Sequence, residues 1–464
     1  MRASALLALG LSAVVGGAQP QPNSLPSVVQ SEADTPLSTL IQETLNQNPD
    51  LAAKTALVEA EQERIPQARA LPDPSLALGL QNDGFKKLQI GMMETSYYQV
   101  MVTQPLPWPG KRGLRGEIAS LEVDSARWAR ERTRLSLVAE VKRAYIGLLL
   151  VRGQMALLTQ QALFWQKAGE ITKVRYEVGQ GTQADLLRAQ LEQIRLRQTR
   201  ISLQSEEKVY LATLNRLRGG SPEAPVRTLA RLEDLPLPSA ENWAARAAEE
   251  SPEVQAARLG TRQAERNLDL AKRDRYPDLA LSAGLMPRGS LDPMWQVGIS
   301  VSLPIWSNQK QHRAVAEQEL RRRAQGSETS SVQNLLHQRI QERSAQLDAA
   351  LEIVQLYREG LLVQSEASFQ ANLAQYEAGR GAFLSVLEAL NGWLADQGSY
   401  LQALAQAQAI QIAQQEFNLT GTPPISAQAL SASAMGMGSS PGGTAKAGPA
   451  PAKGSESSPS MKAM

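Results

Sequence analysis

The residue types that usually carry chemistry are scarce in this chain of 464 residues. It has no cysteine, which excludes a thiolate metal site, a disulfide and a cysteine nucleophile. Its two histidines, His312 and His337, lie in a stretch that is charged on all sides, and we interpret them as solvated side chains. Gly110, Lys111 and Arg112 lack the upstream glycine that a phosphate-binding loop needs. Carboxylates are plentiful, but their spacing is that of ion pairs on helix faces. We therefore expect no enzyme, no cofactor and no metal site in the body of the chain.

The C-terminal segment offers the one set of soft metal ligands. Residues 419–464 are rich in Ala, Ser, Gly and Pro, a composition typical of disorder. Thioether sulfurs in this segment could hold a soft metal ion, and they belong to Met435, Met437, Met461 and Met464. The alternative, which we favour, is a disordered tail without a metal.

The most informative residues belong to a motif that occurs twice. RYEVGQGTQADLL at 175–187 returns 200 residues later as QYEAGRGAFLSVL at 375–387. Apolar residues then continue at seven-residue spacing in both copies, as in packed long helices. A tight turn between two helices explains the glycines, because one can take the left-handed conformation that ends a helix and the next lets the chain reverse. The matched pairs are Tyr176 with Tyr376, Gly179 with Gly379, and Gly181 with Gly381.

The motif divides the chain into two copies of one unit. Each copy reads as helix, strand, strand, long helix, turn and helix. The long helix of about 68 residues would span about 100 Å, which no globular core accommodates. In the first repeat, 37–218, we expect helices at 37–70, 111–178 and 182–218 and strands at 75–81 and 97–103. In the second repeat, 240–418, we expect helices at 241–275, 309–378 and from the second turn to 418, and strands at 277–285 and 295–303.

Three further segments complete this organisation. Residues 1–18 hold an apolar run followed by small residues, which predicts a secretory signal, with a membrane anchor as the alternative. Residues 19–36 should be extended, and 219–239 form a linker rich in Pro and Gly. Because no cysteine follows the signal, we expect no lipid attachment. The near-balanced charge of +2 gives no support for nucleic-acid binding.

The last predicted strand has one apolar face. Its apolar residues alternate with polar or small ones, which suits a wall between lipid and water. A half-buried strand in a soluble sheet is the alternative, but the helices are too long to pack back on the sheet. Four strands cannot close in a membrane, so three chains pooling twelve strands are the economical solution. The lipid-facing residues would be Trp295, Val297, Ile299 and Val301.

With these motifs, residues 37–420 resemble the TolC-type outer-membrane efflux channel family. The resemblance implies a mainly α fold with a small membrane β part: a trimeric 12-stranded outer-membrane β-barrel continued by a 12-helix periplasmic α-barrel. It also implies two partners besides outer-membrane lipid: a periplasmic adaptor (membrane fusion) protein that docks on the turns, and an inner-membrane pump. QPLPWPGKR at 104–112 is similar to the branch that serves resistance-nodulation-division (RND) pumps for heavy metals of the cobalt-zinc-cadmium or copper-silver type.

The resemblance also implies a gate, where contacts between turns of neighbouring subunits pinch the tunnel. By position, the family's aspartate falls on Asp185 and its tyrosine on Tyr376. The family's arginine falls on Gly381, with Arg380 one residue earlier, so the ionic part of the gate departs from the family pattern. Asp185 also stands three residues after Thr182, and the two could instead form a helix-capping box.

The sequence thus predicts a passive trimeric export duct in the outer membrane of a Gram-negative bacterium, extending into the periplasm. Heavy-metal cations are the expected cargo. A drug-efflux or type I protein-secretion duct is the alternative within the family. A secreted coiled-coil scaffold is the alternative from another class, although a scaffold has no need of a strand with one exposed apolar face.

Overall fold

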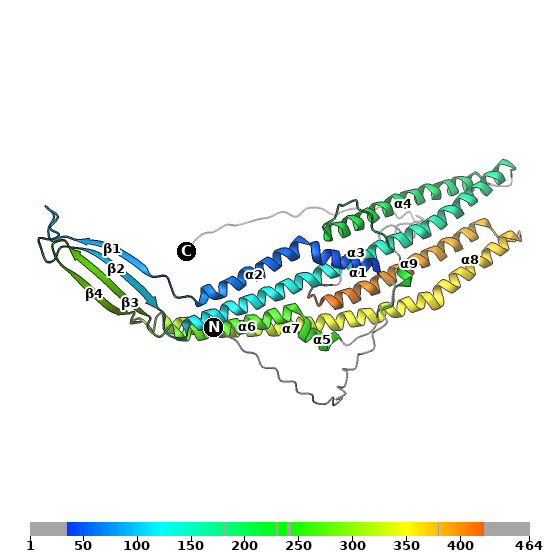
Figure 1. The fold of residues 1–464 in the computed structure, drawn as a ribbon. Coiled ribbons are helices and arrows are strands. Elements are labelled where there is room, and N and C mark those ends of the chain that lie inside the picture. The colour runs from blue at the N-terminus through cyan, green and yellow to red at the C-terminus, as the bar shows by residue number, and fades with distance from the viewer. Residues whose placement is uncertain (1–34, 180–181, 229–230, 239–242, 379, 422–464) are drawn as a thin grey trace, which may run out of the picture.

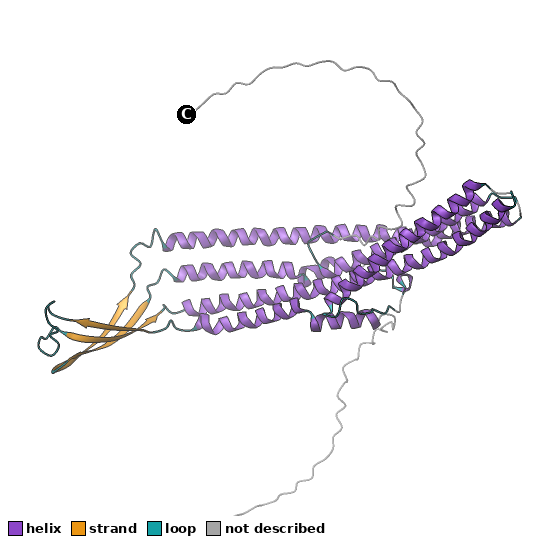
Figure 2. Cartoon of the chain, turned by 90° about the horizontal axis from the view of Figure 1, so that it is seen from above, coloured by secondary structure: helices purple, strands orange, loops and turns teal. Residues whose placement is uncertain are grey.

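The chain forms an elongated, mostly helical molecule in a computed structural model. A four-stranded sheet occupies one end and two helix-to-helix turns the other (Figure 1, Figure 2). Among the described helices, none combines the length and apolar character needed to cross a bilayer. The residues described are 35–179, 182–228, 231–238, 243–378 and 380–421, so the expected signal and the methionines of the tail lie outside them.

The sheet is an antiparallel meander in chain order. Its cross-strand register places Leu78 opposite Val100, Val100 opposite Leu285, and Leu285 opposite Trp295. One apolar row therefore runs across the sheet on a single face, since side chains alternate along each strand. The strands are β1 (Ser75–Gln81), β2 (Tyr97–Leu106), β3 (Leu279–Arg288) and β4 (Leu291–Val301).

The β3–β4 hairpin is tighter than the sequence indicated. Strands were expected at 277–285 and 295–303, yet pairing continues past Leu285 to Met286 opposite Met294 and closes at a turn near Gly289. The residues between the two expected strands include Pro287 and Pro293, which suggested a loop. Both stand near the end of a short hairpin, where a strand tolerates proline.

The first repeat contains two short helices where one was expected. The pattern over 37–70 predicted a single helix, but α1 (Thr35–Gln47) and α2 (Pro49–Arg69) are separate. Pro49 has no N–H to donate, and the side chain of Asn48 caps the new helix by accepting from the Asp50 N–H at 2.9 Å. The long helix α3 (Lys111–Glu177) and its return α4 (Gln183–Leu217) lie within a residue or two of the predicted bounds.

The second repeat departs from the prediction in two places. The helix expected at 241–275 breaks before Pro252 into α5 (Trp243–Glu250) and α6 (Pro252–Arg273), with Ser251 as the cap. The helix expected at 309–378 is α7 (Gln311–Leu356) and α8 (Leu362–Glu377), joined by the π-helical turn η3 (Tyr357–Leu361). The repeat ends with α9 (Phe383–Glu416). The linker before the second repeat contains a 3₁₀ turn, η2 (Leu232–Asp234).

Near the turns, the helices form one layer in the order α4, α3, α9, α8. Near the sheet, the order is α2, α3, α6, α7. Thus α2 and α4 lie end to end along α3, and they are joined where the amide of Asn48 donates to the carbonyl of Leu217 at 3.0 Å. The core is thickest midway along α3, where Tyr145, Leu148 and Leu150 are fully buried. This stretch of α3 is apolar on every side, as expected for a helix with neighbours all round.

Candidate functional site

The first turn is built by a glycine and a capping threonine. Gly179 has φ of +75°, the left-handed conformation expected of it. Thr182 begins α4, and its hydroxyl accepts from the Asp185 N–H at 3.2 Å while donating to the Asp185 carboxylate at 2.7 Å. Thr182 is thereby the N-cap of α4, and the Asp185 carboxylate accepts from the Thr182 hydroxyl rather than from its backbone N–H, so one of the two bonds of the expected capping box is present. Gly181 lies outside the described residues.

The second turn is closed by its backbone. The N–H groups of Arg380 and Gly381 donate to the Gln375 carbonyl at 2.9 and 3.0 Å. A Cβ on Gly381 would lie 3.1 Å from the Tyr376 nitrogen, so this position favours glycine for its small size. Gly379 lies outside the described residues. No side-chain cap begins α9 at Ala382, so the second turn forms without a capping box.

The two turns of one chain meet at the Tyr376 ring. Within the second turn, the Tyr376 centroid is 5.3 Å from that of Phe383. From the first turn, the Arg175 guanidinium carbon lies 5.4 Å from the Tyr376 centroid. This is the geometry of a cation–π interaction. Arg175 belongs to the first repeat and Tyr376 to the second, so the contact ties one hairpin to the other.

A cavity of about 230 Å³ opens between the two hairpins. Asp185 and Tyr376, both expected in the gate, line it together with Arg175 and Arg188. Within the described part of the chain, Asp185 makes no hydrogen bond or ion pair with Tyr376 or Arg380, and a contact across subunits stays a prediction. Sequence reasoning missed Arg175, although it is the charged counterpart of the neutral Gln375 in the aligned motif.

The sheet presents an uncovered apolar face. Trp295, Val297, Ile299 and Val301 on β4 are 75%, 62%, 73% and 46% exposed. The same face continues with exposed leucines on β1 and exposed Tyr98, Val100 and Val102 on β2. The opposite face carries small and polar residues such as Gly298 and Ser300. The predicted alternation is therefore present, and nothing in the described chain packs on the apolar side.

The residues of QPLPWPGKR form a joint between sheet and helices. Trp108 stacks on Tyr276 with centroids 5.4 Å apart. The buried Lys111 ammonium lies 2.9 Å from the Asp278 carboxylate and 3.4 Å from that of Asp274. The motif thus locks the start of α3 to the second repeat, and its role in this chain is structural.

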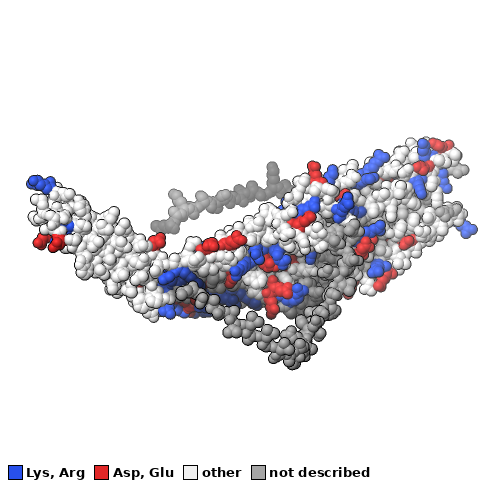
Figure 3. Space-filling model, viewed as in Figure 1, with Lys and Arg blue, Asp and Glu red and all other residues white. Residues whose placement is uncertain are grey.

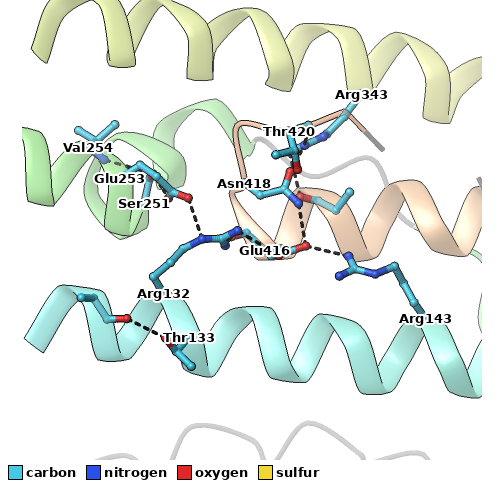
Figure 4. A network of polar contacts seen from close by, with 12 residues as sticks. Arg132, Thr133, Arg143, Ser251, Glu253, Val254, Arg343, Glu416, Asn418 and Thr420 are labelled. Carbon is cyan, nitrogen blue, oxygen red and sulfur yellow. Dashed lines mark hydrogen bonds and ion pairs between the residues drawn. The ribbon is translucent and has the colours of Figure 1, made fainter. Parts of the chain in front are cut away.

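A polar cluster joins α3, α6, α7 and α9 midway along the molecule (Figure 4). The buried Glu416 carboxylate accepts from Arg132 at 3.2 Å and from Arg143 at 2.8 Å. Arg132 also pairs with Glu253 at 2.9 Å, where burial raises the pKa of the Glu253 carboxyl despite that neighbour. Buried Arg343 donates to the Ala413 carbonyl and to Asn418. The cluster is the second repeat's counterpart of the α2–α4 junction.

Both histidines occupy exposed positions. His312 Nε2 lies 2.8 Å from an Arg275 nitrogen on the surface, and His337 is exposed on α7. Over the described ranges, no three His, Cys, Asp or Glu side chains are grouped so that they could hold a metal ion.

Comparison with known proteins identifies the same architecture. The family model "Outer membrane efflux protein" matches residues 40–220 and 243–416, one span for each repeat. The solved outer-membrane channel OprN superposes with a TM-score of 0.71 at 18% identity, covering 82% of this chain and 90% of OprN. The solved CusC superposes with a TM-score of 0.70 at 17% identity, covering 86% of this chain and 98% of CusC.

Two relatives from Cupriavidus metallidurans are each 25% identical in sequence. The cobalt-zinc-cadmium resistance protein CzcC aligns over 82% of this chain and 90% of its own length. The nickel and cobalt resistance protein CnrC aligns over 62% and 68%. The family consists of outer-membrane transport proteins and not of enzymes, as the sequence predicted. With both repeats matched, this chain belongs to the outer membrane efflux protein family.

Proposed function

We propose that the chain is a passive trimeric export duct for heavy-metal cations, working with a periplasmic adaptor protein and an inner-membrane RND pump. The observation that carries this proposal is that the chain has two unpaired edges along its whole length. One edge belongs to the first repeat and the other to the second. Joining unlike edges around a threefold axis closes a ring.

The sheet supplies the first pair of edges. Among the residues described, β1 pairs only with β2 and β4 only with β3, so both outer strands have free backbone groups. Such edges are excluded in lipid, where each unsatisfied group costs several kcal/mol. Three chains joined β4 to β1 give twelve strands with no edge, and their apolar faces meet the lipid.

The helices supply the second pair. Leu187, Leu191, Ile194 and Ile201 form an exposed stripe on α4, opposite the side that packs on α3. The counterparts of Leu187, Ile194 and Ile201 on α9 are buried, because α9 lies inside the layer; they are Leu387, Leu394 and Leu401. Exposed Ile353 and Leu356 on α7 and Val363 on α8 offer an apolar stripe at the other edge. The two stripes suit each other as neighbours in a ring of twelve helices.

The cargo is inferred from the relatives and from the lack of ligands. Among relatives that align along this chain, CzcC and CnrC are named for resistance to cobalt, zinc, cadmium and nickel. A duct needs weak interactions with its cargo, and the described residues contain no cluster able to retain a metal ion. The pump therefore supplies the energy and most of the selectivity.

The turns are proposed as the docking site and the gate. They form the end farthest from the sheet, where the adaptor would reach them (Figure 1). Tyr176, Gly179 and Gly181 would contribute from the first turn, and Tyr376, Gly379 and Gly381 from the second. In the closed duct, the Arg175–Tyr376 contact holds the two hairpins of each chain together. Asp185 and Arg380 remain candidates for contacts between subunits.

Complementation tests the cargo. A strain lacking its own channel, but keeping the pump and the adaptor, should regain growth in cobalt, zinc or cadmium when this chain is expressed. Recovery of tolerance to drugs alone would favour the drug-efflux alternative. A chain that restores neither and stays soluble after cell fractionation would contradict the proposal.

A matched pair of variants tests the ring. Ile194→Glu places a charge on the apolar stripe of α4, so trimers in mild detergent should dissociate. Gln204→Glu adds the same charge to an exposed position off the stripe and should leave the trimer intact. Equal trimer content in both variants would overturn the assigned edge.

A further inference from the structure

We propose that cationic side chains at the junction of helices and sheet form a collar that binds the phosphate headgroups of anionic phospholipids. The collar consists of Arg69, Arg115, Arg273, Arg275, Lys310 and Arg313. This inference rests on the proposed function, because it requires the sheet to lie in a membrane.

The charge of the chain is distributed unequally about the sheet. Segments 69–74, 107–115, 272–278 and 302–313, which join sheet to helices, hold nine lysines and arginines against three aspartates. Segments 82–96 and 286–294, at the opposite end, hold three cationic and three acidic residues. Figure 3 shows an almost uncharged sheet followed by blue side chains where the helices begin. Only the helix-side end therefore carries an excess of positive charge.

The collar residues form no close ion pair with a carboxylate of the described chain, although Arg115 acts on Asp278 at longer range. Two of the three aspartates, Asp274 and Asp278, are already paired with buried Lys111. All six collar residues are exposed, and among the residues that the structure describes none lies within 4.0 Å of a carboxylate. Arg275 contacts His312, which is not an acid. Six exposed cations without a counter-ion attract an anionic surface.

The depth of the collar fits a headgroup layer. The apolar row of β4 continues beyond the strand to Ile305 and Trp306, which are 77% and 72% exposed. Tryptophan and tyrosine collect at the boundary between hydrocarbon and headgroups, and the Trp108–Tyr276 stack lies at the same junction. Lys310 stands four residues after Trp306 and immediately before α7, and Arg313 lies in the first turn of that helix. Guanidinium groups bind phosphate oxygens in a bidentate manner.

A lipid is the occupant that the charges favour. A cationic cargo would be repelled by this excess of positive charge, so the collar does not serve as a cargo site. Each lysine or arginine next to the membrane surface raises the affinity for anionic lipid roughly fivefold.

Lipid titration of the full chain in nonionic detergent tests the collar. Wild-type protein should bind fluorescent phosphatidylglycerol at least about tenfold more tightly than phosphatidylcholine at low salt. The preference should shrink in high salt, because the interaction is screened. Inorganic phosphate at millimolar concentration should not compete; full competition would identify a free-anion site and overturn the lipid assignment.

Three sets of substitutions separate charge from folding. Neutralising four collar residues should remove the preference for phosphatidylglycerol. Replacing the three arginines among them by lysine should keep this preference. The helical content measured by circular dichroism should stay unchanged in both variants. The neutral variant combines Arg115→Gln, Arg273→Gln, Lys310→Gln and Arg313→Gln. The matched control neutralises four exposed cations elsewhere on the helices, Lys54→Gln, Arg197→Gln, Arg200→Gln and Lys208→Gln, and should keep the preference.

Besides full competition by phosphate, the collar is contradicted by the absence of a preference in the wild type or by an equal loss in the control. Metal tolerance measured with the same variants separates this inference from the proposed function. A chain that restores tolerance without preferring phosphatidylglycerol refutes the collar alone. A chain that prefers it without restoring tolerance refutes only the export of metals.

Discussion

The contact between Arg175 and Tyr376 leads to a prediction about opening of the duct. Replacing Arg175 by Gln, the residue that the second repeat has at this position, removes the cation while keeping a polar side chain of similar length. Replacing Tyr376 by Leu removes the aromatic face instead. Both changes should raise the open probability of the trimer, because each releases one hairpin from the other.

The expected magnitude follows from geometry and symmetry. Arg175 is exposed and lies 5.4 Å from the ring centroid, so the contact contributes about 0.5–1 kcal/mol in each chain. Three chains that open together would lose about 1.5–3 kcal/mol, which changes the ratio of open to closed states by roughly ten- to a hundredfold. The double variant should open no more than either single variant, because both remove the same interaction.

Single-channel recording in planar bilayers measures this ratio directly. Arg175→Lys keeps the cation and Tyr376→Phe keeps the ring, so both should stay close to wild type. If the Tyr376 hydroxyl instead formed a hydrogen bond with Asp185 of a neighbouring subunit, Tyr376→Phe would open the channel as much as Tyr376→Leu. That outcome, or an unchanged Arg175→Gln channel, would refute the cation–π gate.

Three other predictions concern the membrane face and the buried cluster. Val297→Arg should lower the stability of the membrane-inserted barrel by about 2–4 kcal/mol if the residue lies near the bilayer midplane. Ser300→Arg, on the opposite face, should have a smaller effect, and an equal loss of membrane-inserted protein in the two variants would contradict the assigned faces. Glu416→Gln should cost about 3 kcal/mol of unfolding free energy, since it removes the carboxylate that pairs with Arg143 and one of the two that pair with Arg132. It should lower the melting temperature far more than the exposed-pair control Glu192→Gln, and similar melting temperatures would mean that the cluster is not stabilising. Because burial raises the pKa of Glu253 in the folded state, its contribution to stability is present below pH 4.5 and is lost as the pH rises through the raised pKa. Between about pH 4 and about pH 7.5, the melting temperature should decrease less in Glu253→Gln than in the wild type. An identical decrease in both proteins would exclude Glu253 as the source of this pH dependence.

Much of the fold could be predicted from local patterns. The long helix α3 and strand β1 follow from periodicity that a single sequence displays, and the turn glycine Gly179 follows from the conformation its position requires. The breaks before Pro49 and Pro252 could also have been read, because a proline with a capping residue before it begins a helix. The periodic pattern on both sides of each proline hid these breaks.

The contacts between repeats could not be read from the sequence. Arg175 and Tyr376 are 201 positions apart, and only the packing of two hairpins brings them together. The cluster around Glu416 likewise joins residues from four helices. In the sequence, each of these residues looks like an ordinary polar or charged position of its own helix. Local patterns predict where a helix lies and which face is apolar, but not which polar side chains meet across helices.

The π turn η3 gives the two long helices a different rotational phase. α3 holds 67 residues, and α7, η3 and α8 hold 46, 5 and 16, again 67. A π turn takes up one residue more than an α turn, so the second helix should be about 1.5 Å shorter, and residues beyond η3 should be turned by about 100° relative to their counterparts. Tyr176 and Tyr376 occupy equivalent positions in the count, yet Tyr176 is exposed while Tyr376 packs on Phe383 beneath Arg175. The duplicated motif thus presents two different surfaces, on helices that differ by one residue in their winding and with Phe383 in the place of Gln183.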